Sequence, residues 1–165
     1  MSNDGRWYLI QCKPRESFRA EVNLNNQGFQ CFHPTHPVKR KVSGVVRSVI
    51  VPLFPHYLFV LLNSQSNWST IRSTRGVSRI VFFNSTPASL DHQLIAGIQY
   101  QCARLNGQEV APLFKPGQHV RITEGCFKEL EAIVTATSGE ERVTLLINLF
   151  NRQQHIELSV HAVAG

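Results

Sequence analysis

The residues of this sequence best suited to chemistry are basic, and they gather in its first 106 positions. That stretch holds 12 lysines and arginines against 4 acidic residues, whereas the rest of the chain holds 5 against 7. The whole chain carries a formal net charge of +6. A basic front half with a weakly acidic rear half predicts that the front meets a polyanion, and it lets the two halves attract one another.

Two of the arginines stand out because of their neighbours. Arg72 and Arg75 flank Ser73 and Thr74, and Gly76 follows. Hydroxyl and guanidinium groups on a tight turn can read base edges as well as bind phosphate. On charge alone, an ordinary solvated surface explains the basic positions equally well. Those positions are Lys13, Arg15, Arg19, Lys39, Arg40, Lys41, Arg72 and Arg75.

The residue types that perform catalysis or bind metals do not form a recognisable pattern. We find no Ser/His/Asp or Cys/His arrangement and no glycine-rich phosphate loop, and four acids in the front half are too few to suggest a carboxylate pair. His33 and His36 could present two imidazoles to a metal, but no third ligand follows nearby, and loop histidines are the better interpretation. We therefore expect no enzyme, no metal and no cofactor.

The composition is typical of a globular protein, with 42% hydrophobic and 17% charged residues. No apolar run approaches the roughly 20 residues that span a bilayer. The first six residues lack the basic start and apolar core of a signal peptide. We therefore expect a cytoplasmic protein with no membrane contact, in which the four scattered cysteines are reduced core thiols. They are Cys12, Cys31, Cys102 and Cys126.

The strongest structural signal lies at residues 52–62. Two prolines in residues 52–55 indicate an ordered turn, because proline suits neither a helix interior nor a central strand. The aromatic and branched run that follows predicts a strand. Alternation places Tyr57 and Phe59 on one face and Leu58 and Val60 on the other. Both faces are apolar, so both must be covered.

The remaining front-half elements predict a small α+β domain. We expect strands at 7–12, 29–32 and 79–83, a basic hairpin at 37–51 and a short helix or turn at 68–73. Helices are expected from Pro14 to Gly28 and at 90–105, the second capped by Ser89 or Asp91. The order β-α-β-β-β-α with antiparallel pairing predicts a sheet with helices packed on one face. The other face stays open.

The rear half admits two structures. Residues 106–115 have the composition of a linker. Pro116-Gly117, an alternating stretch and a glycine turn at Gly125 open a small β-barrel of the KOW type, with later strands at 132–135, 143–150, 155–158 and 161–163. Residues 138–141 instead form an S-x-x-E capping box before an apolar run, which favours a helical hairpin. Such a hairpin could cover the open face of the sheet.

Several motifs in a fixed order carry a family resemblance. They are Trp7-Tyr8, Pro52-Leu53-Phe54-Pro55 with Tyr57-Leu58-Phe59-Val60, Thr74-Arg75-Gly76-Val77, and Pro116-Gly117 with Ile122-Thr123-Glu124-Gly125. Over essentially its whole length the chain resembles the NusG family of transcription elongation factors. Within that family it is most similar to the operon-specific antitermination branch, RfaH. The resemblance implies an NGN-type domain at 1–105, a linker at 106–115 and a KOW-type domain at 116–165.

The resemblance also implies partners for the front domain. An apolar patch centred on Tyr57 and Phe59, with Phe83 nearby, would bind the clamp helices of RNA polymerase, and residues 67–69 would touch its gate loop. Single-stranded non-template DNA would meet a polar surface. By position, the DNA-facing residues would be Lys13, Arg19, Gln27, Thr70, Arg72, Thr74 and Arg75.

In RfaH-like proteins a helical rear hairpin covers the apolar patch until the DNA element is met. The released domain then refolds as a barrel and recruits a small-subunit ribosomal protein, and the protein acts as a monomer. A few kcal/mol between two packings suffices for such a switch. The apolar stripes of the helical pattern predict the residues at this closure, and the resemblance adds Arg142. The apolar residues are Phe127, Leu130, Val134, Leu145, Leu146 and Leu149.

The sequence departs from the family pattern at three positions. Trp68 lies inside the expected gate-loop motif Asn67-Trp68-Ser69, and Gln11 stands where an aromatic residue is expected. Val51 stands where an acid would pair with Arg142, so either Arg142 has another partner or closure is mostly apolar. The resemblance implies an antitermination factor that couples transcription to translation. The alternatives are a general NusG-type factor with a permanent barrel and a KOW-containing ribosome-associated RNA-binding protein.

Overall fold

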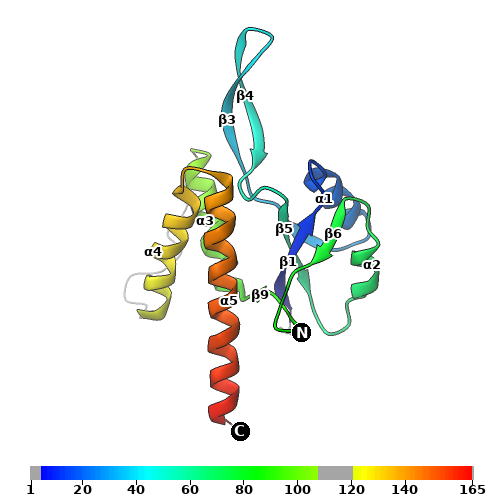
Figure 1. Cartoon of the computed structure of the whole chain (residues 1–165), viewed down its shortest axis with the longest axis vertical. Helices are drawn as coiled ribbons and strands as arrows, with labels where there is room; N and C mark the ends of the chain where they lie inside the picture. The colour runs from blue at the N-terminus through cyan, green and yellow to red at the C-terminus, as the bar shows by residue number, and fades with distance from the viewer. Residues whose placement is uncertain (1–4, 108–120, 165) are drawn as a thin grey trace.

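The computed structural model describes residues 5–107 and 121–164, and it places side chains in 5–107 and 128–152 (Figure 1). No helix among these residues is both long and apolar enough to cross a membrane. The elements in chain order are β1 (Arg6–Cys12), α1 (Ser17–Asn26), β2 (Gln30–Phe32), β3 (Thr35–Val42), β4 (Val45–Pro52), β5 (Tyr57–Leu62), α2 (Trp68–Arg72), β6 (Val77–Ile80), β7 (Phe82–Phe83), β8 (Thr86–Pro87), β9 (Ser89–Leu90), α3 (His92–Leu105), α4 (Arg121–Thr135) and α5 (Gly139–Ala164).

An antiparallel sheet in the order β2-β5-β1-β6 forms the centre of the fold, and β9 also pairs with β1. In the pairing of β1 with β5, Leu9 lies opposite Phe59 and Ile10 lies opposite Leu58. Because successive side chains of a strand point to opposite faces, these two pairs enter two different cores. The mixed α+β class predicted from the sequence is confirmed.

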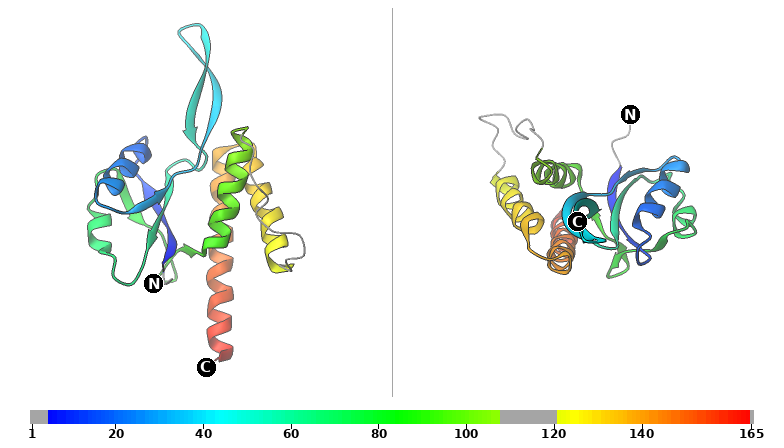
Figure 2. Two further views of the ribbon diagram at one scale, coloured as in Figure 1. Left: turned by 180° about the vertical axis from the view of Figure 1, so that it is seen from behind. Right: turned by 90° about the horizontal axis from the view of Figure 1, so that it is seen from above.

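The first core lies between the sheet and the helices α1 and α2. It contains Ile10, Leu58 and Val60 from the strands, Leu24 from α1 and Ile71 from α2, and each of them is fully buried. This is the face that the domain covers with its own early helices. Figure 2 shows these helices on the opposite side of the sheet from α3, α4 and α5.

The second core covers the other face, and it joins the front half of the chain to the rear half. Leu9, Phe54 and Phe59 meet Ile98 from α3 and Phe150 from α5 in one buried cluster. Helix α3 starts at the Asp91 cap, as the sequence predicted, with the Asp91 carboxylate accepting a hydrogen bond from the Leu94 amide at 3.0 Å. The sequence placed this helix on the same face as α1, but it lies on the opposite face, beside the rear helices.

The rear half is helical throughout the described residues 121–135 and 139–164. Of the two structures the sequence allowed, the helical hairpin is therefore the one adopted here, and the barrel strands expected at 132–135, 143–150, 155–158 and 161–163 are parts of helices. The S-x-x-E signal accounts for the start of α5, because the Glu141 amide donates to the Ser138 hydroxyl oxygen at 3.1 Å. The expected opening of the barrel at 116–120 lies outside the described residues.

Strands β3 and β4 form a separate two-stranded hairpin that projects away from the rest of the molecule (Figure 1). Its turn is Ser43-Gly44, and both residues have positive φ, +52° and +81°. This is the pair of conformations that the tight turn of a hairpin requires. Arg40 and Arg47 lie directly opposite each other near the middle of the hairpin.

Smaller differences from the sequence analysis concern short elements. The strand expected at 79–83 is divided between β6 and β7, and the two-residue strands β8 and β9 had not been expected. Most of the linker expected at 106–115 lies outside the described residues. The domain boundaries at 105, 115 and 116 therefore stay predictions.

The cysteines with described side chains are free thiols. Cys12 is buried and Cys31 is partly buried, and burial raises the pKa of each thiol to about 12. A thiol with such a pKa stays protonated and is a poor nucleophile at neutral pH. The side chain of Cys126 lies outside the described residues.

Candidate protein and nucleic-acid interfaces

An aromatic stack centred on Phe59 joins the sheet to the rear helical hairpin. The Phe59 ring lies 5.9 Å from the Phe150 ring of α5, with 16° between the ring planes, and 5.6 Å from Phe32 at 19°. Phe54 meets the same ring edge-on at 6.3 Å. Phe59, Phe54 and Phe150 are fully buried. The surface expected to bind a partner protein is thus covered by the chain's own α5.

The other two aromatic residues assigned to that surface lie at its margin. Tyr57 on β5 and Phe83 on β7 are partly buried and pack against the cluster that contains Phe59. Gln11, which reduces the aromatic content of this region, accepts a hydrogen bond from Nε of Arg79 at 2.6 Å. Separating the hairpin from the sheet would expose one contiguous surface around Phe59.

The apolar rear residues expected at closure gather at this contact where their side chains are described. Leu130, Val134, Leu146 and Leu149 are buried in the shared core, and Leu145 is packed at its edge. The side chain of Phe127 lies outside the described residues. Phe150, which falls on the same helical stripe as Leu145, Leu146 and Leu149, is buried in this core too. Ile133 also belongs to the core but was not expected there, and its position at i+3 from Leu130 is the signal that would have found it.

A polar contact made by Arg142 accompanies the apolar one. Its Nε donates to the Leu53 carbonyl oxygen at 2.7 Å and its Nη1 donates to the Ala136 carbonyl oxygen at 2.8 Å. The first bond joins the rear hairpin to the turn before β5, and the second closes the end of α4. Arg142 forms no ion pair within the described part of the chain, and burial lowers the pKa of its guanidinium. The alternative partner expected for Arg142 is therefore the backbone.

The turn between α4 and α5 also fits closely against the proline turn of the front half. A Cβ atom on Gly139 would lie 2.5 Å from Cγ of Pro55 and 2.9 Å from its Cδ. Only glycine allows this approach without a shift of one element. The residues at 52–55, expected to fix the start of β5, thus also provide a contact surface for the rear hairpin.

A second candidate surface is basic and lies where α1 meets the loop between α2 and β6. Lys13, Arg19, Arg72 and Arg75 are exposed there. The loop is held to the start of the front domain by the Lys13 amide, which donates to the Gly76 carbonyl oxygen at 2.9 Å.

Gly76 permits this arrangement. It has φ +97°, and a Cβ atom would lie 2.7 Å from the Ala20 nitrogen, so the loop touches the α1 backbone. On the α1 side, Nδ2 of the Asn23 side chain donates to the Arg75 carbonyl oxygen at 3.0 Å. Arg19 is the one member of this basic group that pairs with an acid in the described residues, at 2.8 Å from Glu16. The structure therefore brings together basic residues from two distant segments.

The polar members of the same predicted set have local roles in this loop. The Thr74 hydroxyl donates to the Thr70 carbonyl oxygen at 2.8 Å and accepts from Nε2 of Gln27 at 2.8 Å. Thr74 is buried, with 5% of its surface exposed. Its hydroxyl is occupied within the protein, so Thr74 positions the loop, while the arginines on either side of it point to solvent.

The Asn67-Trp68-Ser69 motif, expected to contact the gate loop, also contains both exposed and packed residues. Asn67 caps α2, and its side-chain oxygen accepts from the Ser69 hydroxyl at 2.7 Å and from the Thr70 amide at 3.3 Å. Asn67 and Ser69 are exposed. Trp68 is partly buried and meets the Tyr8 ring edge-on at 4.6 Å. The tryptophan that departs from the family pattern therefore packs on the first core.

His33, one of the two histidines considered as metal ligands, pairs with an acidic side chain. Nδ1 of His33 is 3.2 Å from the Glu21 carboxylate, and burial lowers the pKa of the imidazole. No group of three potential ligands occurs among the described residues.

Comparison with known proteins identifies the family. The model of the NusG family, described as a transcription termination factor, matches residues 5–99. The transcription termination/antitermination protein NusG of Lactococcus lactis is 28% identical and aligns over 99% of this chain and 94% of its own length. Its counterpart in Escherichia coli K12 is 25% identical over 96% and 94%. A solved structure concerned with domain interaction in Thermotoga maritima NusG covers 70% of this chain at 18% identity, with a TM-score of 0.44. The chain belongs to the NusG family.

Proposed function

We propose that this protein is an operon-specific antitermination factor of the RfaH type. It binds the clamp helices of RNA polymerase and a DNA element in the exposed non-template strand, reduces pausing and termination, and couples transcription to translation. It performs no enzymatic reaction. The observation that supports this function is the cover of Phe59 by Phe150, because a docking surface closed by the protein's own hairpin binds polymerase only after a specific signal.

The proposal gives the two surfaces different partners. The apolar surface around Tyr57, Phe59 and Phe83 binds the clamp helices once the hairpin leaves, and the exposed Asn67 and Ser69 contact the gate loop. The basic surface binds the single DNA strand. After release, the rear domain (116–165) refolds as a barrel that binds a small-subunit ribosomal protein.

A general NusG-type factor is the second candidate function. The names of the relatives favour it, since proteins called NusG align with this chain over 94% or more of its length. A general factor needs its polymerase-binding surface free at all times. The two candidates therefore differ in whether the rear hairpin competes with polymerase.

Affinity for core RNA polymerase, measured without the DNA element, separates them. Phe150→Ala removes a buried ring that belongs only to the hairpin, at a cost of about 3–5 kcal/mol to closure. We expect it to bind polymerase at least ~10-fold more tightly than the wild type, since ~1.4 kcal/mol corresponds to tenfold. Phe59→Ala removes a ring that both the hairpin and polymerase use, so it weakens polymerase binding although it also weakens closure.

The matched control is Glu140→Ala, an exposed position on the same helix. It should leave the affinity within about twofold of the wild type. If Phe150→Ala and the control bind alike, the hairpin does not compete with polymerase and the general factor is the better description. The double variant Phe59→Ala/Phe150→Ala, compared with Phe150→Ala alone, separates the polymerase contact from closure. Equal polymerase binding by these two would exclude Phe59 from the interface.

A further inference from the structure

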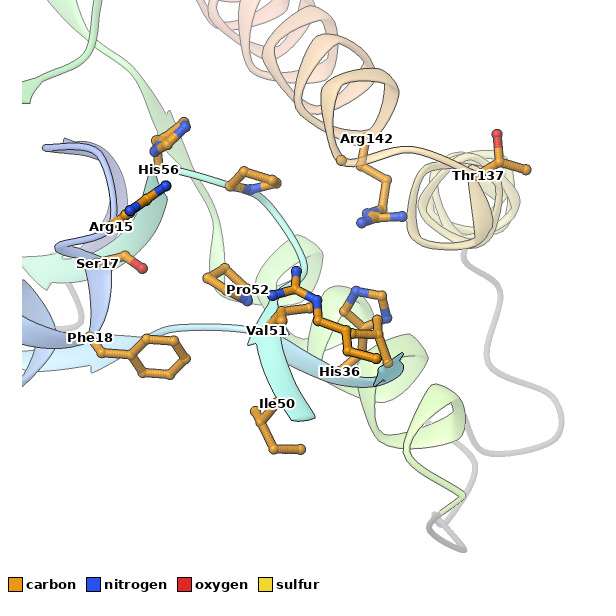
Figure 3. Close-up of a pocket in the computed structure, with 14 residues that line it drawn as sticks. Arg15, Ser17, Phe18, His36, Ile50, Val51, Pro52, His56, Thr137 and Arg142 are labelled. Atoms are coloured by element: carbon orange, nitrogen blue, oxygen red, sulfur yellow. The ribbon is translucent and has the colours of Figure 1, made fainter. Parts of the chain in front are cut away.

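A cavity of about 560 Å³ lies where the basic hairpin, the start of α1 and the turn of the rear helices meet (Figure 3). Its walls come from both halves of the chain, with Thr137, Gly139 and Arg142 contributed by the rear. The volume falls within the range of about 300–1,000 Å³ that is usual for small-molecule sites. None of the residues that the family resemblance assigned to DNA or polymerase lines it, although Arg142, assigned to closure, does.

The lining is positively charged. Arg15, Arg40 and Arg142 line the cavity together with His36 and His56, and none of its lining residues is acidic. Figure 3 shows Arg142 reaching toward His36 from the rear helices, with Arg15 and His56 on the opposite side. Because like charges gathered around a partly enclosed space repel one another, an anion bound there would relieve the repulsion.

Several polar groups of the lining have no partner inside the protein. Nε2 of His36 is buried and accepts or donates no hydrogen bond within the described residues. In the same part of the chain, no side-chain hydrogen bond or ion pair involves Arg15, Arg40 or His56. Glu141 bonds to the Thr137 hydroxyl at 3.4 Å, but Glu141 is exposed and does not line the cavity. The basic groups are thus available to a ligand.

Two of these residues have a backbone conformation that is unfavourable for their type. Arg15 has φ +64° and His56 has φ +73°, in the left-handed region that glycine adopts without cost. Residues other than glycine with such φ values cluster at sites of function. Here both are cationic or titratable side chains that face the same cavity.

The cavity also offers an apolar surface. Phe18 and Ile50 line it and are 44% and 56% exposed, which is high for large apolar side chains. We propose that this cavity is a binding site for a small organic phosphate, with the phosphate bound by Arg15 and Arg40 and a flat apolar group packed on Phe18 and Ile50. Arg142 contributes its positive charge from the opposite wall.

Binding in this cavity would stabilise the contact between the two halves, since each half supplies part of the wall. This consequence rests on the proposed function, in which the closed arrangement keeps polymerase away. A bound organic phosphate would then hold the factor in its closed form. The site itself does not depend on that role.

The probe for the site is adenosine 5′-monophosphate, titrated calorimetrically into the full chain at 150 mM salt. We expect saturable binding, weaker binding of orthophosphate and none of adenosine. Arg40→Gln and Arg15→Gln should each weaken binding of the nucleotide at least tenfold. The matched control is Lys41→Gln, which removes the same charge from the neighbouring exposed position and should change the affinity less than twofold.

A second variant guards against loss of folding. Arg15→Gly removes the guanidinium and suits the left-handed backbone, so its Tm should equal or exceed that of the wild type while nucleotide binding falls tenfold. Phe150→Ala, which loosens the rear wall, should also bind the nucleotide more weakly.

Three results would overturn the proposal. The first is absence of saturable nucleotide binding to the wild-type chain. The second is an equal loss with Lys41→Gln and Arg40→Gln, which would mean attraction to net charge alone. The third is binding of a single-stranded oligonucleotide that requires Arg15 and Arg40, together with no binding of the mononucleotide. That result would make the cavity a nucleic-acid site. The polymerase measurement with Phe150→Ala uses no nucleotide, so failure here leaves the proposed function untouched.

Discussion

At the scale of single residues, Arg142 and Val51 show which interactions hold the two halves of this protein together. A buried guanidinium is costly unless its charge is compensated. Here the compensation comes from two backbone carbonyl oxygens, those of Leu53 and Ala136. Val51 lines the same cavity as Arg142 but offers no charge. The closed arrangement is therefore held by an apolar core and by hydrogen bonds to the backbone.

Val51→Glu should strengthen closure, because it places a carboxylate in the cavity that Arg142 lines. We expect a net gain of about 1 kcal/mol, because the cost of burying a second charge beside Arg142 offsets much of the attraction between them. This gain would be seen as a several-fold lower affinity for core polymerase. The control is Val49→Glu, on the same face of β4 and outside the cavity lining. If both variants bind polymerase alike, a carboxylate at position 51 does not interact with Arg142.

His36 makes the stability of the fold depend on pH. Burial, and then the positive charge of Arg142, lower the pKa of this imidazole below its ordinary value of 6.5. The unfolded chain therefore binds a proton at a higher pH than the folded chain does. The contribution of His36 to stability is complete above pH 6.5 and is lost as the pH falls through the folded-state pKa.

His36→Val should accordingly flatten this dependence, because it removes both the proton site and the unpartnered Nε2 atom. Urea unfolding at pH 5.0 and pH 7.5 measures it, and we expect the variant to lose less stability on acidification than the wild type. His33, whose pKa burial also lowers, remains in both proteins and leaves a residual slope. An unchanged difference between the two pH values would show that His36 is not responsible.

At the scale of elements, the turn between α4 and α5 makes a close contact with the proline turn of the front half. The Pro55 ring lies where the Cβ of a residue at 139 would be. A proline ring inside a fixed turn cannot move aside, whereas a leucine end can change rotamer. Gly97 offers a natural comparison, since its added Cβ would lie 2.5 Å from Cδ1 and 3.9 Å from Cγ of Leu130, both in one flexible side chain.

Gly139→Ala should therefore displace the rear hairpin, while Gly97→Ala should be tolerated better. We expect the first to raise polymerase affinity severalfold and the second to change it by less. Alanine favours a helix interior over glycine by about 1 kcal/mol. This gain applies to Gly97 inside α3 and not to Gly139, the first residue of α5, so helix propensity does not account for a larger effect of Gly139→Ala on polymerase affinity. Equal effects would mean that the close approach to Pro55 does not limit closure.

The sequence predicted these elements well where the physical signal was local. The two-faced apolar strand at 57–62, the Asp91 cap and the Ser138 cap of α5 each depend on neighbours within a few positions, and each occurs in the structure. Local sequence could not decide between helix and barrel in the rear half, because the apolar pattern of residues 143–150 fits both the helical and the strand period. The apolar face around Phe59, distant in sequence, stabilises the helical form by covering its stripe.

The same distinction applies to the candidate site residues. The family resemblance placed Thr74 on the DNA-facing surface and Trp68 in the gate-loop motif by position alone. In the fold, Thr74 bonds to Gln27 across 47 positions, and Trp68 packs on Tyr8. Neither contact leaves a periodic trace in the chain. The cavity beside Arg142 likewise arises only when the β3–β4 hairpin, α1 and the turn between α4 and α5 are brought together.

At the scale of the whole molecule, one apolar core is shared by two halves that carry opposite net charges. The front holds an excess of basic residues and the rear a small excess of acidic ones. Screening by salt weakens such long-range attraction. Burial of six large or branched side chains from the rear helices, each worth about 1.5–3 kcal/mol, is the larger contribution. These side chains are Leu130, Ile133, Val134, Leu146, Leu149 and Phe150.

A rear segment cut off from the front half loses this cover, and that loss decides its fold. The stripe formed by Leu146, Leu149 and Phe150 would face water in an isolated hairpin, which favours a structure that buries the stripe internally, such as the barrel. Far-ultraviolet circular dichroism of residues 101–165 alone should therefore show β signal, while the difference between the full chain and its front half should show α signal. An isolated segment that stays helical would mean that the helices are stable without the sheet, and the proposed switch would then have no driving force.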